Sequence, residues 1–376
     1  MTATAPPLGR DEFSLDEGFV YLNHAAAGPL PNRTRDALVR GVLGQAAEGV
    51  LGVAEIERRR PALRERAGAF VGAAGDEIAF LRNTGDGANV VARGLAWSAG
   101  DEVVLCDNEF GANAQPWLAL REIGVVPRLI GTPAKRMTAA ELRAQMTART
   151  RVVAVSWISF FDGYRHDLDA LADVAHERGA LLCVDAIQGL GAFPLDVKRS
   201  KIDALYAGGA KWLLSLPGVS MLYVDRALQK RLAVRWRGWR DVEDIWNFLH
   251  YDQPLAPDGS RYEGGTPNFL GVSGLAASMD VIDGAGTDRI AAHVLGLTDY
   301  LVERLTEKGA TILTERGPGI SSGIVTFLLP GSDPVALGRS LGERRVCVTY
   351  RPSGIRVSPH GYNTRADVDA LIAGLG

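Results

Sequence analysis

The chain has 376 residues, with 41 basic and 44 acidic side chains and a formal net charge of −3. Basic residues are scattered among acidic ones, which excludes a concentrated basic surface, so we expect no nucleic acid as a partner. No apolar run is long enough to span a bilayer and the N-terminus lacks a secretion signal, so we expect no membrane partner and a cytoplasmic location.

The three cysteines, Cys106, Cys183 and Cys347, are far apart in the sequence. Cys106 and Cys183 lie within apolar, strand-like runs, which favours buried thiols in a reducing compartment. No Cys-X-X-Cys pair or Cys/His cluster occurs, so we expect no metal site.

The N-terminal part of the chain predicts a short strand, a loop and two helices. Residues 19–31, FVYLNHAAAGPLP, form an apolar strand that breaks into a loop, which could bring backbone close to a ligand. A helix is expected from Asn32 through Arg59, where Pro61 interrupts it, and a second helix continues through Phe70.

From Ile78 onward, short apolar runs alternate with stretches of helical period. Strands are expected at residues 78–82, 101–106, 125–130, 151–159, 180–185, 202–207 and 218–224. The helices between them are expected to begin at Thr84, near Trp117 after a loop over 107–116, after Met137, and at Asp167. Strands separated by helices of about ten to fifteen residues predict an α/β fold with a mostly parallel, doubly wound sheet.

The C-terminal third predicts a second, smaller domain. Residues 236–258 are rich in tryptophan, acid and proline without a clean period, so we expect an irregular excursion that covers another surface or forms an interface. Helices from about Val272 to Thr306 precede short strands and two helices, at 334–343 and 365–374, which predict an α+β domain. The expected division is a lead-in at 1–18, a large domain at 19–265 and a small domain at 266–376.

Two residues of the large domain are costly to bury without partners, and they suggest a cofactor. Asp185 ends the apolar strand LLCVD, and Lys211 lies among the small residues of AGGAKWLL. Pyridoxal phosphate needs a lysine to form a Schiff base and an acid to keep its pyridine nitrogen protonated. Ligands of doubly wound sheets bind at the carboxyl ends of the strands, where 84–87, Phe110, Asp185 and Lys211 would meet.

Each of these residues also has a simpler interpretation. Thr84 could cap a helix, Asp185 could cap the helix that follows its strand, and Lys211 could lie on the surface. Arg356, in SGIRVSPHGYNT, could be an exposed charge on a strand. The joint pattern is harder to explain in this way.

Larger motifs carry a family resemblance. In order, the chain contains YLNHAAAGPLP, RNTGDGANVVARGL, EFGANAQPW, SWISFFDG, VDAIQGLGAFPLDV, AGGAKWLL, YEGGTPN and GIRVSPHGYNT. Over residues 19–376 this order resembles the class V aminotransferase-like group of pyridoxal phosphate enzymes, which includes cysteine desulfurases, kynureninase and isopenicillin N epimerase-like proteins. The resemblance implies the fold type I of enzymes dependent on pyridoxal 5′-phosphate, with a cofactor-binding large domain and a small α+β C-terminal domain.

The resemblance also implies a role for each residue that matches a motif. Lys211 would form the Schiff base and move the Cα proton, and Asp185 would pair with the pyridinium nitrogen. The other residues expected to bind the cofactor are Thr84, Gly85 and Asp86 at the phosphate, Phe110 over the ring, Gln188 at O3′, and Gly265 and Thr266 at the phosphate of a neighbouring subunit. The last pair implies a homodimer with shared active sites.

On the substrate side, the resemblance assigns Arg356, Asn23 and His24. Arg356 would clamp the α-carboxylate of an amino-acid substrate with its two-pronged guanidinium. Asn23 and His24 lie on the family's substrate-side loop. Trp157 stands where many members place a polar residue near the substrate.

The chain departs from the desulfurases in ways that bear on the reaction. Many desulfurases carry a histidine before the lysine and a hydroxyl three residues before it, where this chain has Ala210 and Gly208. The four residues between Arg351 and Arg356 include no cysteine, and Cys347 lies in a strand-like run. A desulfurase that uses a cysteine nucleophile is therefore not expected.

The leading expectation is an enzyme that acts at Cα or Cβ of an amino acid or amino-acid conjugate, by transamination or by C–S or other β-elimination. The alternative is an epimerase of the isopenicillin N epimerase type. Phe110, where desulfurases stack a histidine, favours the lyase and epimerase branches. A catalytically silent binding protein is a remote alternative, opposed by the presence of Lys211, Asp185 and Arg356. A nucleotide-binding oxidoreductase is opposed by the lack of a GxGxxG motif after the first strand.

Overall fold

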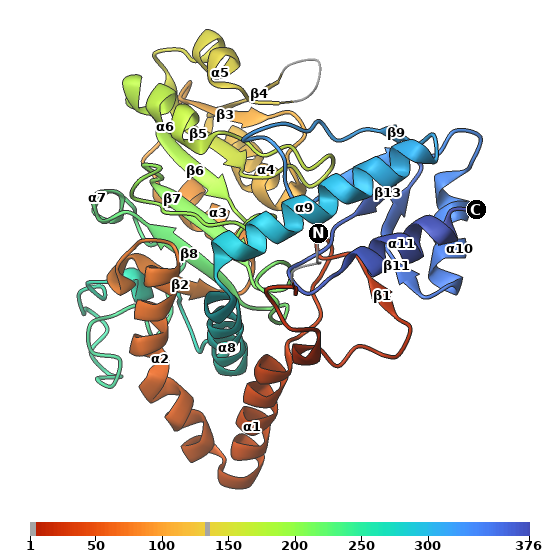
Figure 1. The fold of residues 1–376 in the computed structure, drawn as a ribbon. Helices are drawn as coiled ribbons and strands as arrows, with labels where there is room; N and C mark the ends of the chain where they lie inside the picture. The colour runs from red at the N-terminus through yellow and green to blue at the C-terminus, as the bar shows by residue number, and fades with distance from the viewer. Residues whose placement is uncertain (1–4, 132–135) are drawn as a thin grey trace.

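A central sheet of buried apolar strands organises the molecule (Figure 1). The computed structural model describes residues 5–131 and 136–376, and within these ranges the central sheet has seven strands; residues 1–4 of the expected lead-in lie outside them. The order across the sheet is β2 (Ile78–Leu81), β8 (Ser220–Val224), β7 (Ala204–Gly208), β6 (Leu181–Asp185), β5 (Thr150–Ser156), β3 (Glu102–Cys106) and β4 (Val126–Ile130). β8 runs antiparallel to both of its neighbours, whereas the other pairs are parallel. The expected mostly parallel, doubly wound α/β fold is confirmed.

Side chains on the two faces of this sheet pack into separate cores, because successive residues of a strand point to opposite faces. Val153 and Val155 of β5 belong to one buried cluster, whereas Val152 and Ala154 belong to another. The α-helices between the strands are α3 (Thr84–Gly94), α4 (Gly111–Leu118), α5 (Ala139–Gln145), α6 (Leu168–Glu177) and α7 (Arg226–Gln229). Short 3-10 segments are η1 (Arg10–Glu12), η2 (Gly75–Glu77), η3 (Ala119–Ile123) and η4 (Gly259–Tyr262). Burial of both faces explains why these strands are nearly continuous apolar runs.

Two long helices near the N-terminus, α1 (Asn32–Glu48) and α2 (Val50–Phe70), form a hairpin that projects from the body of the molecule (Figure 1). The expected break at Pro61 is wrong, because the chain reverses at Gly49 and Pro61 lies inside α2. Gly49 has a φ of 58° and a ψ of −121°, a backbone conformation that a Cβ disfavours. α8 (Phe269–Ala285) packs against both helices of the hairpin.

The helix expected from near Trp117 begins earlier than predicted. α4 starts at Gly111 and runs into η3, so the loop expected over 107–116 is too long. Pro116 suggested a loop, but it lies within this helix. As a consequence, Phe110 is the N-cap residue of α4 and its position is set by the helix.

The C-terminal part of the chain has an antiparallel sheet of its own. Its strands, in order, are β12 (Thr349–Arg351), β13 (Gly354–Val357), β10 (Val325–Leu328) and β9 (Thr311–Ile312). The accompanying helices are α9 (Thr287–Glu307), α10 (Pro334–Glu343) and α11 (Arg365–Gly374) (Figure 1). β1 (Val20–Tyr21) pairs in parallel with β11 (Val346–Cys347), which ties the N-terminal strand to this part. The strands and helices expected here are confirmed, and the division at residues 265 and 266 remains our proposal.

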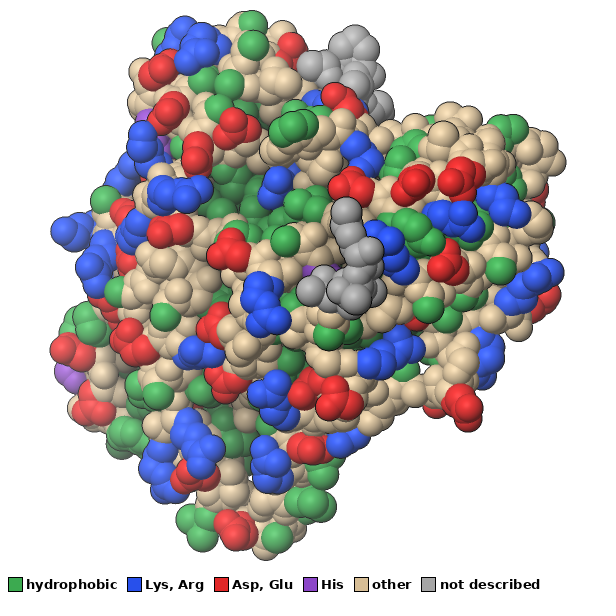
Figure 2. Space-filling view, viewed as in Figure 1, with side chains coloured by type: hydrophobic (Ala, Val, Ile, Leu, Met, Phe, Trp, Pro, Cys, Tyr) green, Lys and Arg blue, Asp and Glu red, His purple; other side chains and the backbone are tan. Residues whose placement is uncertain are grey.

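The surface combines mixed charges with an irregular aromatic segment. Residues 236–258 contain an isolated bridge between Val242 and Leu255 and no longer strand or helix. The large apolar side chains exposed there are Trp236, Trp239, Trp246, Phe248, Leu249 and Tyr251. On the face in Figure 2, basic and acidic side chains are interspersed. No helix in the described ranges is both long and apolar enough to cross a membrane.

Candidate active site

Asp185 ends β6 at the carboxyl edge of the central sheet, between Ser156 of β5 and Tyr206 of β7. Its side chain is buried, and Oδ1 accepts a hydrogen bond from the N–H of Ile187 at 2.9 Å. Oδ2 is also buried but has no hydrogen-bond partner among the described residues. Burial raises the pKa of Asp185 to about 6, although the Ile187 bond and the charge of Lys211 oppose this shift. A bare, buried carboxylate oxygen requires a donor from outside the chain.

Lys211 follows the end of β7 by three residues, which brings it to the same edge of the sheet as Asp185. Its side chain is partly buried, and Nζ lies 5.5 Å from the centroid of the Phe110 ring. Burial lowers the pKa of Lys211 to about 8; Asp185 opposes this shift, whereas Arg356 and Arg351 add to it. Part of this amine is therefore neutral near pH 7, and the neutral form is the one that can act as a nucleophile or a base.

The loop after β1 packs directly against the lysine loop. A Cβ on Gly28 would lie 2.5 Å from the carbonyl oxygen of Lys211, so only glycine fits there. Gln188 is buried and joins the two loops: Nε2 donates to the carbonyl of Ala25 at 3.0 Å, and Oε1 accepts from Trp212 Nε1 at 2.9 Å. The amide retains a second N–H, so the contact of Gln188 with O3′ of the cofactor stays a prediction.

The expected phosphate turn lies at the N-terminus of α3. Asn83 caps this helix by accepting from the N–H of Asp86 at 2.9 Å, and Thr84 is its first residue. The Thr84 hydroxyl accepts from the N–H of Gly208 at 3.1 Å, which holds the turn against β7. N–H groups at a helix N-terminus bind anions, and those of Thr84 and Gly85 remain at the open end. Phosphate contacts by Thr84, Gly85 and Asp86 stay predictions, and the N–H of Asp86 already donates to Asn83.

Phe110 presents an exposed aromatic ring beside the lysine. The residue is 46% exposed, and its ring meets that of Phe160 edge to face at a centroid distance of 5.2 Å. A flat ligand next to Lys211 could stack on a ring in this position. Stacking of Phe110 on the cofactor stays a prediction.

Arg356, on β13 of the C-terminal sheet, is buried where that sheet meets the loop after β5. Nη1 donates to the carbonyl of Phe160 at 2.6 Å and Nη2 to the hydroxyl of Thr349 at 3.3 Å. Nε is buried without a hydrogen-bond partner among the described residues. Burial lowers the pKa of Arg356 to about 10, and the charge of Arg351 lowers it further. A buried guanidinium whose neighbour is another cation fits a carboxylate ligand.

Asn23 and His24 are neighbours in sequence but lie in different surroundings. Asn23 Oδ1 accepts from Thr349 Oγ1 at 2.7 Å, so it supports the hydroxyl that Arg356 contacts. His24 is completely buried, its Nδ1 lies 2.9 Å from the carbonyl oxygen of Ser358, and burial lowers its pKa well below 6.5. The structure thus brings Asn23 toward the arginine and His24 into the core. Substrate contacts by either residue stay predictions.

Gly265 and Thr266 lie at the surface, beside the α1–α2 hairpin. Thr266 is exposed and its hydroxyl accepts from Trp239 Nε1 at 3.3 Å. Together with residues of both helices, Thr266 lines a hollow of about 320 Å³. The contact of this pair with the phosphate of a partner subunit stays a prediction.

Comparison with known proteins decides the family. Residues 20–371 match the family model for class V aminotransferases. The chain belongs to the class V aminotransferase family. A probable cysteine desulfurase of Streptomyces coelicolor is 30% identical over 389 residues, which cover 95% of this chain and 91% of the relative. An isopenicillin N epimerase of Amycolatopsis lactamdurans is 28% identical over 100% of this chain and 99% of its own length. The structure of an apo cysteine desulfurase from Thermococcus onnurineus NA1 superposes with a TM-score of 0.89 at 25% identity, covering 99% and 98% of the two chains.

This membership confirms the resemblance that the motifs carry. The protein is a fold type I enzyme of the class V aminotransferase family, and pyridoxal 5′-phosphate is its cofactor. The residues present fit that group. The bare Oδ2 of Asp185 suits a protonated pyridine nitrogen, and the Lys211 amine, with its lowered pKa, suits the aldehyde.

Sequence reasoning missed Glu109, which lies at the same edge of the sheet. Its carboxylate accepts from Ser156 N at 2.7 Å, from Ser156 Oγ at 2.5 Å and from Asn113 Nδ2 at 2.9 Å. Burial raises the pKa of Glu109 to about 7 against the effect of these bonds, and the charge of Asp185 adds to the rise. Because Glu109 precedes Phe110, the three bonds fix the chain from which that ring projects. The signal was available: an acid follows the buried strand β3, as Asp185 ends β6.

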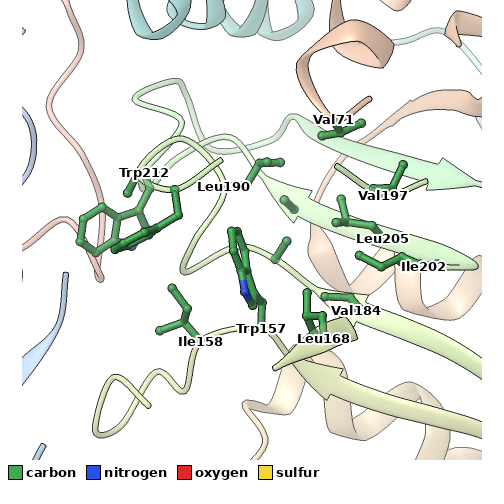
Figure 3. Close-up of a cluster of buried hydrophobic side chains, with 14 of the residues drawn as sticks. Val71, Trp157, Ile158, Leu168, Val184, Leu190, Val197, Ile202, Leu205 and Trp212 are labelled. Atoms are coloured by element: carbon green, nitrogen blue, oxygen red, sulfur yellow. The ribbon is translucent and has the colours of Figure 1, made fainter. Parts of the chain in front are cut away.

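Trp157 lies in the core and not in the crevice of this class V site. Its side chain is 5% exposed and its ring lies among buried residues that include Val184 and Leu190 (Figure 3). Trp157 therefore does not take the place of a polar residue on the substrate side. Phe160, three residues later, contacts Arg356 through its carbonyl and Phe110 through its ring.

Proposed function

We propose that this class V enzyme acts at Cα or Cβ of an amino acid or amino-acid conjugate, by transamination or by C–S or other β-elimination. One observation carries the proposal: Asp185 and Arg356 are both buried with polar atoms that no described residue satisfies, and both act electrostatically on Lys211. An acid, an amine and a guanidinium in this relation match a ring nitrogen, an aldehyde and an α-carboxylate.

Each of the three side chains then has a distinct task. When bound, pyridoxal phosphate supplies an aldehyde that combines with amines and a protonated ring that withdraws electrons from Cα. Asp185 would hold the proton of the ring nitrogen at Oδ2. Arg356 would orient the substrate through its α-carboxylate, and Lys211 Nζ would remove and return the proton at Cα. Phe110 would cover one face of the ring and limit the access of water.

Cys347 supports a reaction without a cysteine nucleophile. It lies on β11, which pairs with β1, and Asn23 Nδ2 is 3.9 Å from its sulfur. Burial raises the pKa of this thiol, whereas a reactive cysteine needs a lowered pKa. The strands that carry Arg351 and Arg356 pair directly, Arg351 with Gly354, which leaves a tight turn and no mobile loop between them. We therefore do not propose that the protein carries a persulfide.

Epimerisation is the alternative function. It is supported by the similarity to the isopenicillin N epimerase of Amycolatopsis lactamdurans, which extends over the full length of this chain. Epimerisation uses the same loss of the Cα proton, with return of the proton to the opposite face. The two proposals therefore differ in the fate of that proton and not in the binding of the substrate.

The products formed in heavy water test both proposals. The holoenzyme is incubated with a panel of amino acids in D₂O, with Lys211→Ala as the inactive control. A keto acid with conversion of the cofactor to its amine form indicates transamination. A keto acid with ammonia and a released thiol or other β-substituent indicates elimination, and a Cα-deuterated product of inverted configuration indicates epimerisation. If the panel yields none of these products and no exchange at Cα, the proposed function is wrong.

We also propose that the enzyme is a cytoplasmic homodimer with shared sites. The exposed aromatic segment at 236–258 and the surface position of Thr266 support an interface there. Cys183, completely buried within β6, supports a compartment in which thiols stay reduced. Sedimentation on dilution, with release of cofactor measured in parallel, tests the shared site. A monomer that keeps its full complement of cofactor contradicts it.

A further inference from the structure

Arg351 and Arg356 lie on the same face of the β12–β13 hairpin. In the register of the two strands, Thr349 lies opposite Arg356 and Arg351 lies opposite Gly354. Because side chains alternate along a strand, Thr349 and Arg351 point to one face, and Arg356 shares that face with its partner Thr349. The hairpin therefore presents two guanidinium groups to the crevice that contains Lys211.

The two arginines are fixed by a single residue of the large domain. The carbonyl of Phe160 accepts from Arg356 Nη1 at 2.6 Å, and the ring of Phe160 lies 5.7 Å from Arg351 Cζ. The same ring meets Phe110, whose own ring lies 5.5 Å from Lys211 Nζ. Arg351 is thus connected to the lysine through a short row of aromatic rings, and not directed away into solvent.

No acid in the described part of the chain pairs with either arginine. The charged neighbour that acts on Arg356 is Arg351, and both arginines act on Lys211 as like charges. Three cations thus face one crevice in which Asp185 is the acid that opposes them. Such a cluster repels itself unless anions bind in it.

Arginines that lie over aromatic rings elsewhere in the molecule show what is missing here. Three of them also pair with a carboxylate: Arg10 over Tyr362 with Asp367, Arg82 over Trp236 with Asp86, and Arg345 over Phe19 with Asp16. Arg351 has the aromatic contact without the carboxylate. An anion from a ligand would complete the same arrangement.

We propose that Arg351 binds a second carboxylate of the substrate, so that the preferred substrate is an amino acid or conjugate with an acidic side chain. The inference rests on the proposed function, in which Arg356 takes the α-carboxylate. The aliphatic part of the substrate would then lie against Phe160 and Phe110. Arg351 is a specificity-determining residue in this arrangement and takes no part in the chemistry.

Amino acids methylated at Cα test this proposal without turnover, because they have no Cα proton to lose. The absorbance of the holoenzyme is titrated with 2-methylaspartate, 2-methylglutamate and 2-methyl-2-aminoadipate, and with the neutral analogues 2-aminoisobutyrate and isovaline. We expect at least one acidic analogue to bind about tenfold more tightly than the neutral ones, as for a charge-assisted contact. Three chain lengths are used because the reach between the two guanidinium groups selects among them.

Two variants and a matched control separate this role from a structural one. Arg351→Gln is expected to abolish the preference for acidic analogues and to leave the affinity for neutral analogues within about twofold, and Arg351→Lys to keep part of the preference. Arg365→Gln is the control, because Arg365 also lies over an aromatic ring, that of Tyr300, at the start of α11. We expect this control to behave as the unmodified enzyme.

The outcomes distinguish this proposal from the proposed function. Equal binding of acidic and neutral analogues by the unmodified enzyme, or an equal loss for both classes in Arg351→Gln, overturns the role of Arg351 and leaves the amino-acid enzyme intact. A spectrum that no analogue changes overturns the proposed function, and with it the inference. A preference that survives in Arg351→Gln assigns the second carboxylate to another residue and also overturns the proposal.

Discussion

Two buried acids at opposite edges of the central sheet differ in what surrounds them. Glu77 lies before β2, at the amino edge, and is 1% exposed. Its Oε1 accepts from Lys198 Nζ at 2.5 Å and from Arg226 N at 3.2 Å, and its Oε2 accepts from Ala74 N at 3.2 Å. Asp185, at the carboxyl edge, is equally buried but has one oxygen without a partner in the described chain.

Burial alone therefore does not distinguish a structural acid from a functional one. The bonds of Glu77 complete the carboxylate within the fold, so this acid stabilises the protein. Asp185 stays incomplete until a ligand donates to it, and the same holds for Arg356 at that edge. The unsatisfied groups gather at the edge where doubly wound sheets bind ligands.

The largest expected effect comes from removing the lysine at the carboxyl edge. Lys211→Ala should lower turnover at least about 10³-fold, because both covalent attachment of the cofactor and proton transfer at Cα are lost. Borohydride reduction followed by peptide mapping should no longer fix cofactor to the chain. Lys198→Ala, which removes the partner of Glu77, should retain the attachment. Retained fixation in Lys211→Ala contradicts the assignment.

Neutralising each of the two acids should separate function from stability. Asp185→Asn should reduce turnover about 10²-fold, as does the loss of one aligned electrostatic contact, without lowering the free energy of unfolding. Glu77→Gln should lower the free energy of unfolding by about 2 kcal/mol and leave turnover nearly unchanged. Denaturant unfolding and steady-state kinetics of both variants provide the measurement. The reverse pattern would show that the comparison is wrong.

The buried arginine at the carboxyl edge should affect substrate and not cofactor. Arg356→Lys should weaken the binding of amino acids at least about tenfold, because one ammonium cannot reproduce the two-pronged contact with a carboxylate. The affinity for pyridoxal phosphate should change little. Absorbance titrations with amino acid and with cofactor measure the two effects separately. An equal loss of both affinities excludes a specific role in substrate binding.

The pH dependence of cofactor attachment should show the smallest effect. Burial lowers the pKa of Lys211 to about 8, from an ordinary value of 10.5. The neutral amine is the reactive form, so attachment to the apo protein should become faster as the pH rises and should level off above about pH 8. Between pH 7 and pH 8 the rate should rise about fivefold. A rate that still rises steeply from pH 9 to pH 10 contradicts a lowered pKa.

The same shift has a defined sign in stability. Between about pH 8 and 10.5 the unfolded chain binds more protons at Lys211 than the folded protein, so the contribution of this group to stability increases as the pH rises. Asp185 acts in the opposite direction, because its pKa is raised from 3.8 to about 6. Its contribution decreases as the pH rises across that interval.

Much of the fold and part of the site could be predicted from the sequence, because both depend on local pattern. Apolar runs and helical periods are set by neighbours in the chain, and they led to the sheet, its flanking helices and the C-terminal α+β part. Asp185 and Lys211 stood out because a charge within an apolar run is costly wherever it occurs. The break of the first long helix was misplaced, because Pro61 is tolerated inside α2 while Gly49 reverses the chain.

What only the tertiary structure decided is which polar groups are satisfied. The contact between Arg356 and Phe160 joins residues 196 positions apart, and that between Thr349 and Asn23 joins residues 326 apart. No local pattern reveals such partners, or places His24 in the core. The sequence by itself determined the fold class, the family and the acid and lysine of the cofactor site, because these follow from residue type and order. The pairing of distant groups determined that the carboxyl edge carries unsatisfied charge and that Arg351 faces it, because hydrogen bonding and charge compensation depend on position in space.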